Sequence, residues 1–354
     1  MTVGSCFVFR ALIVGAATIL AGANGARARD FTYAGWGGGL QDAQREAFLK
    51  PMAEATKKPV KEDVYLGGTA KFEAMKASKD VVWDVVNVEA DVLQRGCDDG
   101  TFLKLDYAKV GTAKDAFIPG AAADCGIGSY TWAFALAYDA STTKEAPQTL
   151  ADFWNIAEWP GRRGLRKGPL FNMELALLAD GVAPEDVYKT LATPEGRDRA
   201  FKKLDQIKSQ VVWWEAPAQT AELLSAGTVA MIIAPNARIS AAVKAGKDFK
   251  MVFKPGMIGI DYWVVVNGSP EVDAAYTFLK IATAPKAQAD FSNSFAYGPT
   301  VKAATPLLAK DAAELLPVGD TVSGALNLSS SEANSFWADN ADELNERWNA
   351  WLAR

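Results

Sequence analysis

Short apolar runs alternate with amphipathic segments through the first third of the chain. The apolar runs at 31–34, 61–65 and 81–88 predict strands, and the segments at 41–55, 71–79 and 90–95 predict the helices that follow them. Strands that alternate with helices are typical of a mostly parallel sheet with helices on both faces. We therefore expect an α/β fold.

The turns after these three strands fall at 35–39, 67–69 and 87–89. Each turn lies at the carboxyl end of its strand, and ligands of open α/β sheets bind beyond those ends. We expect these three separate segments to surround one crevice.

A second unit is predicted after the apolar segment 130–138. Its expected elements are a helix start at 147–154, a turn at 160–164, helices at 173–178, 184–191, 195–207 and 219–226, and a strand at 229–233. A further apolar strand at 262–266 precedes a helix at 272–284, and 336–352 is expected to be an amphipathic helix packed on one unit. No Pro/Gly/Ser linker separates the units, so we expect ordered strands to join them.

The N-terminus reads as a cleaved export signal over residues 1–28. Arg10 precedes an apolar run at 11–23, and Ala26-Arg27-Ala28 supplies a small-x-small cleavage pattern. The run is shorter than the roughly 20 apolar residues that span a bilayer. No lipobox cysteine follows it, and Cys6 leaves with the signal. The mature protein is therefore expected in the periplasm, the alternative being that this segment is a buried first helix.

Composition narrows the possible functions. Without residues 1–28 the chain has 326 of its 354 residues, enough for two domains, and its 35 basic and 42 acidic side chains give a net charge of −7. That balance argues against nucleic acid as a partner. The absence of histidine removes Ser-His-Asp and Cys-His sites and nearly all zinc sites. We expect no cofactor and no metal, while paired carboxylates remain possible.

Two cysteines, Cys97 and Cys125, remain after cleavage. In an oxidising compartment an even pair predicts a disulfide, which would close a loop of about 30 residues and contribute roughly 3–4 kcal/mol. A buried unpaired pair is the alternative.

The chain resembles bacterial extracellular solute-binding proteins of the polyamine (spermidine/putrescine)-binding type, the periplasmic components of ABC importers. The residues that carry the resemblance are spread over the whole mature chain: Trp36-Gly37-Gly38-Gly39, Asp84-Val85-Val86-Asn87-Val88-Glu89, Phe117-Ile118-Pro119-Gly120, Asn236-Ala237-Arg238, Asp261-Tyr262-Trp263 and Tyr297-Gly298-Pro299-Thr300.

The resemblance implies a type II periplasmic-binding-protein fold with two α/β lobes that close on a ligand. Its strand crossovers would lie near Tyr138 and Tyr262. The first lobe would comprise 29–137 and 263–303, and the second lobe 138–262 and 304–354. The expected partners are a small-molecule ligand and the membrane permease subunits of an importer, with the receptor itself a monomer.

Candidate ligand contacts combine aromatic rings with charged groups. Trp36 lies beside glycines that allow close approach, and the resemblance implies that it stacks on the ligand, where a cation–π contact would suit an ammonium group. Glu89 follows a buried strand, and the resemblance places an amine-binding carboxylate at Asp261. The full candidate set is Trp36, Gly37, Gly38, Thr69, Glu89, Trp132, Asn172, Glu215, Asn236, Arg238, Asp261, Tyr262 and Tyr297.

Packing in the core or solvated turns are the alternatives for these side chains. The chain also departs from the polyamine receptors, because Gly168-Pro169 stands in their acidic stretch and Gly259 stands in place of an aromatic residue. Arg166, Lys167 and Arg238 bring positive charge near the expected crevice. Arg238 could pair with Glu89 or Asp261, or hold a ligand carboxylate in a bidentate manner.

The sequence thus predicts a receptor, not an enzyme, for a small cationic or zwitterionic nitrogenous solute. Polyamine-like, opine, amino-acid-like and thiamine-like ligands stay open. The rival functions are an exported hydrolase that uses Glu89 and Asp261 as a carboxylate pair and a chemoreceptor adaptor of the same fold.

Overall fold

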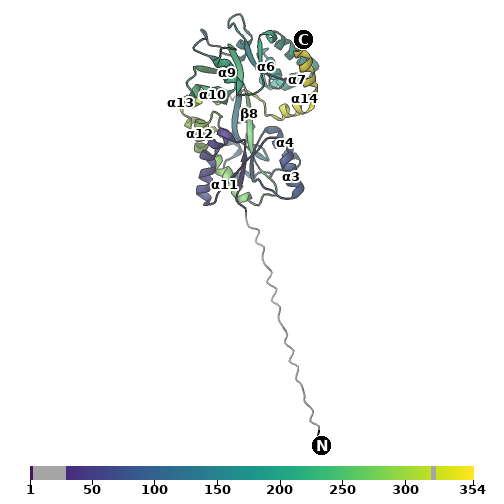
Figure 1. The fold of residues 1–354 in the computed structure, drawn as a ribbon, viewed down its shortest axis with the longest axis vertical. Coiled ribbons are helices and arrows are strands. Elements are labelled where there is room, and N and C mark those ends of the chain that lie inside the picture. The colour runs from purple at the N-terminus through teal and green to yellow at the C-terminus, as the bar shows by residue number, and fades with distance from the viewer. Residues whose placement is uncertain (3–28, 320–323) are drawn as a thin grey trace.

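The computed structural model describes residues 1–2, 29–319 and 324–354. These residues form two lobes, one above the other, with β8 running from one to the other (Figure 1). The predicted export signal lies almost wholly outside the described residues. In the described part of the chain, no helix has the length and apolar character needed to cross a membrane.

Nine strands of the described chain form one mixed sheet in the order β2-β1-β3-β8-β4-β7-β5-β6, with β9 paired to β8. The pairs β1–β2, β1–β3, β5–β6 and β5–β7 are parallel, whereas β8 and β4 run antiparallel to their main neighbours. The strands are β1 (Thr32–Gly35), β2 (Lys61–Val64), β3 (Val85–Val88), β4 (Gly126–Asp139), β5 (Arg163–Arg166), β6 (Val211–Trp214), β7 (Met231–Pro235), β8 (Phe249–Val265) and β9 (Leu326–Asn327).

Helices cover the sheet in both lobes. In the first lobe, α1 (Gly38–Gln44), the π-helical η1 (Arg45–Leu49) and α2 (Lys50–Thr56) follow one another without a break. The other helices are α3 (Ala70–Ser78), α4 (Ala90–Asp98), α5 (Tyr107–Val110), η2 (Lys114–Ala116), η3 (Leu150–Trp154), α6 (Asn172–Ala179), η4 (Pro184–Asp186), α7 (Val187–Leu191), α8 (Pro194–Asp205), η5 (Lys208–Gln210), α9 (Gln219–Ser225), α10 (Asn236–Lys244), α11 (Val272–Ala282), α12 (Pro285–Ser294), η6 (Lys302–Leu307), α13 (Lys310–Ala313) and α14 (Ser331–Leu352).

Two separate hydrophobic cores define the lobes. The first contains Tyr130 and Ile260, and the second contains Phe134 and Met257. The partly buried Trp132 packs against both cores. Strands β4 and β8 therefore pass from one core to the other around Trp132, a few residues earlier in each strand than the crossovers expected near Tyr138 and Tyr262.

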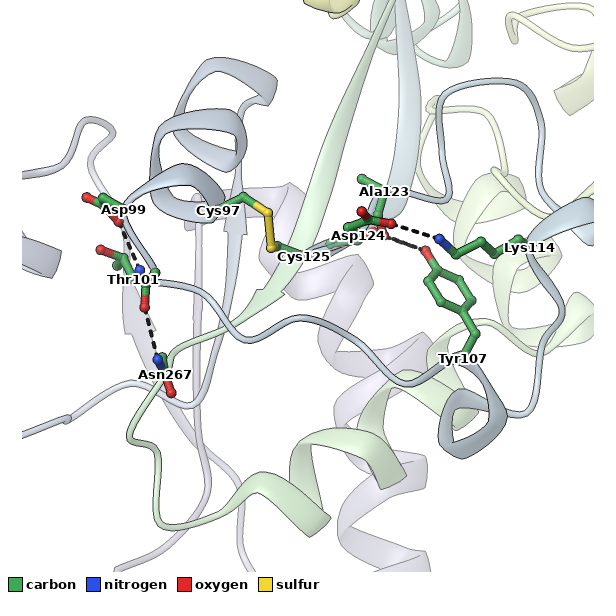
Figure 2. Close-up of a disulfide and its surroundings, with 11 residues drawn as sticks. Cys97, Asp99, Thr101, Tyr107, Lys114, Ala123, Asp124, Cys125 and Asn267 are labelled. Carbon is green, nitrogen blue, oxygen red and sulfur yellow. Dashed lines mark hydrogen bonds and ion pairs between the residues drawn. A yellow bond between two sulfur atoms is a disulfide. The ribbon is translucent and has the colours of Figure 1, made fainter.

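The predicted disulfide is confirmed. Cys97 in α4 is bonded to Cys125, directly before β4, with 5.6 Å between their Cα atoms (Figure 2). Beside the bridge, the Tyr107 hydroxyl donates to the carbonyl of Ala123 at 2.8 Å. The bridge links the helix that follows Glu89 to the strand that carries Trp132.

Most predicted elements exist, but several boundaries were wrong. The turn expected at 160–164 runs into β5, which begins at Arg163. Arg163 escaped prediction as a strand residue because it is charged, yet it is fully buried and donates to the carbonyls of Phe153, Gly161, Asn155 and Trp159. The strand expected at 262–266 is the end of the 17-residue β8.

Candidate functional site

Asp261 is the centre of a polar cluster at the junction of the lobes. Its Oδ2 accepts from the Tyr130 hydroxyl at 2.7 Å and from Nε1 of Trp36 at 3.0 Å. Its Oδ1 accepts from Nε1 of Trp132 at 2.9 Å. Burial raises the pKa of this carboxyl to about 6, although the three donors favour its charged form.

Strand pairing puts these partners within reach of each other. Tyr130 of β4 lies opposite Asp261 of β8, and Trp132 lies opposite Gly259. Residues two apart on a strand share a face, so Tyr130 and Trp132 point to the same side as Asp261. A Cβ on Gly259 would meet the Trp132 ring at 2.0 Å. The missing side chain at 259 is therefore what lets the indole reach the carboxylate.

Trp36 approaches the same carboxylate from the end of β1. Gly37 and Gly38 follow it with positive φ angles of 71° and 59°, a conformation that glycine adopts without strain and that starts α1. The Tyr65 ring packs on Trp36 with centroids 4.8 Å apart. The half-buried indole is thus held in place by its ring neighbour and by its hydrogen bond to Asp261.

Glu89 lies close to the same indole. A Cβ built on Gly67 would stand 3.9 Å from Oε1 of Glu89 and 3.9 Å from the Trp36 ring, so both side chains border this glycine turn. Burial and the nearby Asp261 raise the pKa of Glu89 to about 7. Its Oε2 is buried and has no hydrogen-bond partner among the described residues. The first lobe therefore presents an unsatisfied acceptor beside an aromatic ring.

The second lobe adds aromatic and cationic groups. The Trp132 ring meets Phe171 edge-on with centroids 6.1 Å apart. The guanidinium carbon of Arg166 lies 5.2 Å from the centroid of the Phe171 ring. Because Trp132 reaches Asp261, these contacts form a continuous path from Asp261 to Arg166.

Tyr297 and Arg238 border the cluster from another side. Tyr297 stacks on Tyr130 with centroids 4.7 Å apart. Burial, together with the Asp261 charge, raises the pKa of Tyr297 to about 12, and the charge of Arg238 acts in the opposite direction. Arg238 is an exposed residue of α10, and its charge acts on the Tyr297 hydroxyl.

Five candidate side chains have their polar groups committed elsewhere. Asn236 is fully buried, accepts from the Ala133 amide and donates to the Ala296 and Leu315 carbonyls. The others pair as follows: Asn172 with the carbonyls of Arg166 and Gly168, Glu215 with Lys167, Thr69 with Glu73, and the Tyr262 hydroxyl with the Gly120 carbonyl. Asn172 and Asn236 fix backbone at the edge of the site, and none of the five joins the cluster around Asp261.

Three members of the cluster were absent from the predicted set: Tyr65, Tyr130 and Phe171. The period-two pattern around Trp132 could have revealed Tyr130, since both belong to one strand face. Phe171 gave no signal, because its contact with Arg166 depends on a positive φ of 73° just before α6.

The cluster lacks the features of a metal centre. Among the residues that the structure describes, no group of three or more His, Cys, Asp or Glu side chains could hold a metal ion. The first lobe contributes carboxylates and aromatic rings to this cluster. The second lobe contributes aromatic rings, with arginines nearby. Such a set can recognise a small charged organic molecule by stacking and charge-assisted hydrogen bonds.

Comparisons with family models, curated proteins and solved structures all point to the same protein family. The family of bacterial extracellular solute-binding proteins matches residues 50–316. A gamma-aminobutyric acid (GABA)-binding protein of Pseudomonas aeruginosa is 44% identical over 331 residues, covering 93% of this chain and 92% of that protein. The solved structure of the Atu4243 GABA receptor is similar with a TM-score of 0.77 and 31% identity, covering 92% of this chain and 98% of that one.

A second solved structure is that of the binding protein MotA from A. tumefaciens B6 in complex with glucopine. It has a TM-score of 0.72 and 30% identity, and the match covers 92% of this chain and 100% of that one. This chain therefore belongs to the bacterial extracellular solute-binding proteins, non-enzymatic receptors that bind small molecules for ABC transporters.

Proposed function

We propose that this receptor captures a small zwitterion with one ammonium and one carboxylate group, of the 4-aminobutanoate (GABA) class. The observation that carries the proposal is the Asp261 cluster, a buried carboxylate beside the unsatisfied Glu89 and the Trp36 ring. An ammonium placed there gains a cation–π contact and charge-assisted hydrogen bonds in a site of low polarity. The similarity to two GABA receptors supports the same ligand class.

The carboxylate of such a ligand needs a cation at the other end. Arg238 stands near Tyr297 and can hold a carboxylate through two parallel hydrogen bonds. A polyamine carries ammonium groups at both ends and would place one of them among arginines. The charge distribution therefore favours a zwitterion over the polyamines that the sequence resemblance suggested.

We further propose that the protein works in the periplasm as the receptor of an importer. The export signal, the disulfide and the family support this location. The ligand-bound monomer would deliver its solute to the membrane permease subunits of an ABC transporter. A chemoreceptor adaptor without transport would have the same fold, and importer genes next to the gene of this protein would distinguish the two roles.

Opines form the second candidate class, favoured by the similarity to a protein solved with glucopine. One experiment separates the candidates: thermal unfolding of the purified mature protein with GABA, glucopine, putrescine, thiamine, choline and basic amino acids. A specific ligand at a thousand times its Kd stabilises the folded state by about 4 kcal/mol. We expect GABA or a close homologue to give the largest shift, and Asp261→Asn to abolish it. A larger shift with putrescine would refute the proposal.

A further inference from the structure

The charged side chain of Arg166 has no hydrogen-bond or ion-pair partner in the described part of the protein. Arg166 is the last residue of β5, partly buried, and burial lowers the pKa of its guanidinium. Among the described residues its side chain makes no hydrogen bond and no ion pair, and its guanidinium lies over the Phe171 ring. None of its nitrogens is a fully buried atom without a partner, so the guanidinium stays open to solvent and is free to pair with a ligand.

Two charged residues close to Arg166 in the sequence, Arg163 and Lys167, do have partners. Arg163 on the same strand gives its guanidinium to four backbone carbonyls. Lys167 pairs with Glu215 at 2.8 Å. The Arg166 backbone carbonyl accepts from the Asn172 side chain at 2.6 Å, which fixes the strand end from which the guanidinium projects.

The position of Arg166 points to the ligand. Its ring partner Phe171 contacts Trp132, and Trp132 donates to Asp261. Beyond Asp261, Trp36 and Glu89 border the same glycine turn, and Glu89 has a buried oxygen without a partner in the described chain. Glu89 and Arg166 thus lie at the two ends of one series of contacts, which runs through Trp36, Asp261, Trp132 and Phe171.

We propose that Arg166, laid on the Phe171 ring, is a specificity-determining residue that receives an anionic group of the ligand and rejects ligands with a second ammonium. This inference rests on the proposed function and assigns a second cationic contact besides Arg238. Bidentate pairing with a carboxylate satisfies the guanidinium, whereas an ammonium at the same place meets a like charge.

The test uses two probes that share an amine and a carbon chain and differ at the other end: GABA, which ends in a carboxylate, and putrescine, which ends in an amine. Their Kd values are measured by titration calorimetry on the wild-type mature protein and on Arg166→Gln. We expect Arg166→Gln to weaken GABA at least tenfold and to leave putrescine unchanged or tighter. Arg166→Lys, which keeps the charge, should retain part of the discrimination.

Matched controls make the outcome decisive. Arg162→Gln removes the same charge from an exposed position before β5 and should leave both Kd values unchanged. Arg166→Gln should not lower the melting temperature substantially, because its side chain has no hydrogen bond or ion pair to lose and contacts only the Phe171 ring. An unchanged ratio of the two Kd values in Arg166→Gln, or a melting temperature that falls as far as that of Arg163→Gln, overturns the inference. If the wild type binds no zwitterion, the proposed function itself fails.

Discussion

The Trp132 indole occupies the space directly over Gly259, where a Cβ would come within 2.0 Å of the ring. The two residues are paired across β4 and β8, two positions from the pair formed by Tyr130 and Asp261. Their close approach brings Nε1 of Trp132 to 2.9 Å from Asp261. A glycine on one strand thus sets the position of an indole that helps to hold the central carboxylate.

We therefore predict that Gly259→Ala weakens ligand binding at least tenfold, because the new methyl group displaces the indole and removes one donor from Asp261. Calorimetry with GABA measures the effect. Gly39→Ala is the control, since the nearest atom to its added Cβ lies 3.9 Å away, and it should bind normally. Wild-type affinity in Gly259→Ala would show that the indole position is unimportant.

Ligand binding should strengthen as the pH rises from about 5 to 8. Burial holds the pKa of Glu89 at about 7 and that of Asp261 at about 6, so both acids are partly protonated below neutrality. A bound ammonium favours their charged forms, so binding releases protons in this range, while the ligand keeps both charges because its own groups titrate near pH 4 and 10.

The measurement is calorimetry at pH 6.5 in two buffers with different ionisation enthalpies. The apparent binding enthalpy should differ between the buffers in the direction of proton release. Glu89→Gln should lose most of this difference. A Kd that stays constant between pH 5 and 8 would contradict the role given to these two acids.

Glu174 is a separate buried acid, in the first turn of α6, that affects stability. Its Oε1 accepts from Trp337 of α14 at 2.6 Å and from Tyr188 of α7 at 3.2 Å, while Oε2 is buried without a partner in the described chain. Burial raises its pKa to about 7. Between its unfolded pKa, near 4.5, and this value the folded state binds more protons, so stability falls as the pH rises through this window.

The loss associated with Glu174 is about 3 kcal/mol once the pH exceeds 7. Glu174→Gln keeps an acceptor for both donors and carries no charge, so it should unfold at higher urea than the wild type at pH 8 and at a similar concentration at pH 4.5. A variant that is less stable than the wild type at pH 8 would refute this account.

Asp84 is a fully buried carboxylate that depends on Arg29. Two guanidinium nitrogens of Arg29 donate to it at 2.6 and 2.7 Å, and the Thr32 amide and the Ser269 hydroxyl complete its partners. Arg29→Gln leaves a buried charge short of donors and should lower the free energy of unfolding by about 1–3 kcal/mol. The exposed ion pairs of Arg45 provide the control, for which Arg45→Gln should cost about 1 kcal/mol or less. Equal effects in urea unfolding would contradict the prediction.

The alternating pattern of strands and helices was enough to predict the fold class, because each amphipathic segment has one face to bury. The pattern predicted β1 and β3 and the helices that follow them. It also predicted that the turns at the carboxyl ends of these strands lie close together. The length of β8 was not predictable, since Lys250 and Lys254 interrupt the apolar pattern at the exposed end of the strand. The helices α10 and α12 were missed for a similar reason, as small and polar residues dominate them.

That the candidate residues bind a ligand stays a prediction. Four of them, Trp36, Glu89, Trp132 and Asp261, lie together in the structure. Asn236 shows the limit of such reasoning, because an asparagine that binds a ligand and one that binds three backbone groups look the same in a sequence. The free guanidinium of Arg166 is likewise visible only once every possible partner has been placed.

The most direct test of the central claim is calorimetry of the wild-type mature protein with GABA and with its two halves, butylamine and butanoate. If opposed charges on the two lobes recognise both ends of one molecule, GABA should bind at least a hundredfold more tightly than either half. Equal affinity for butylamine and GABA would contradict the claim, because the carboxylate would then contribute nothing to recognition.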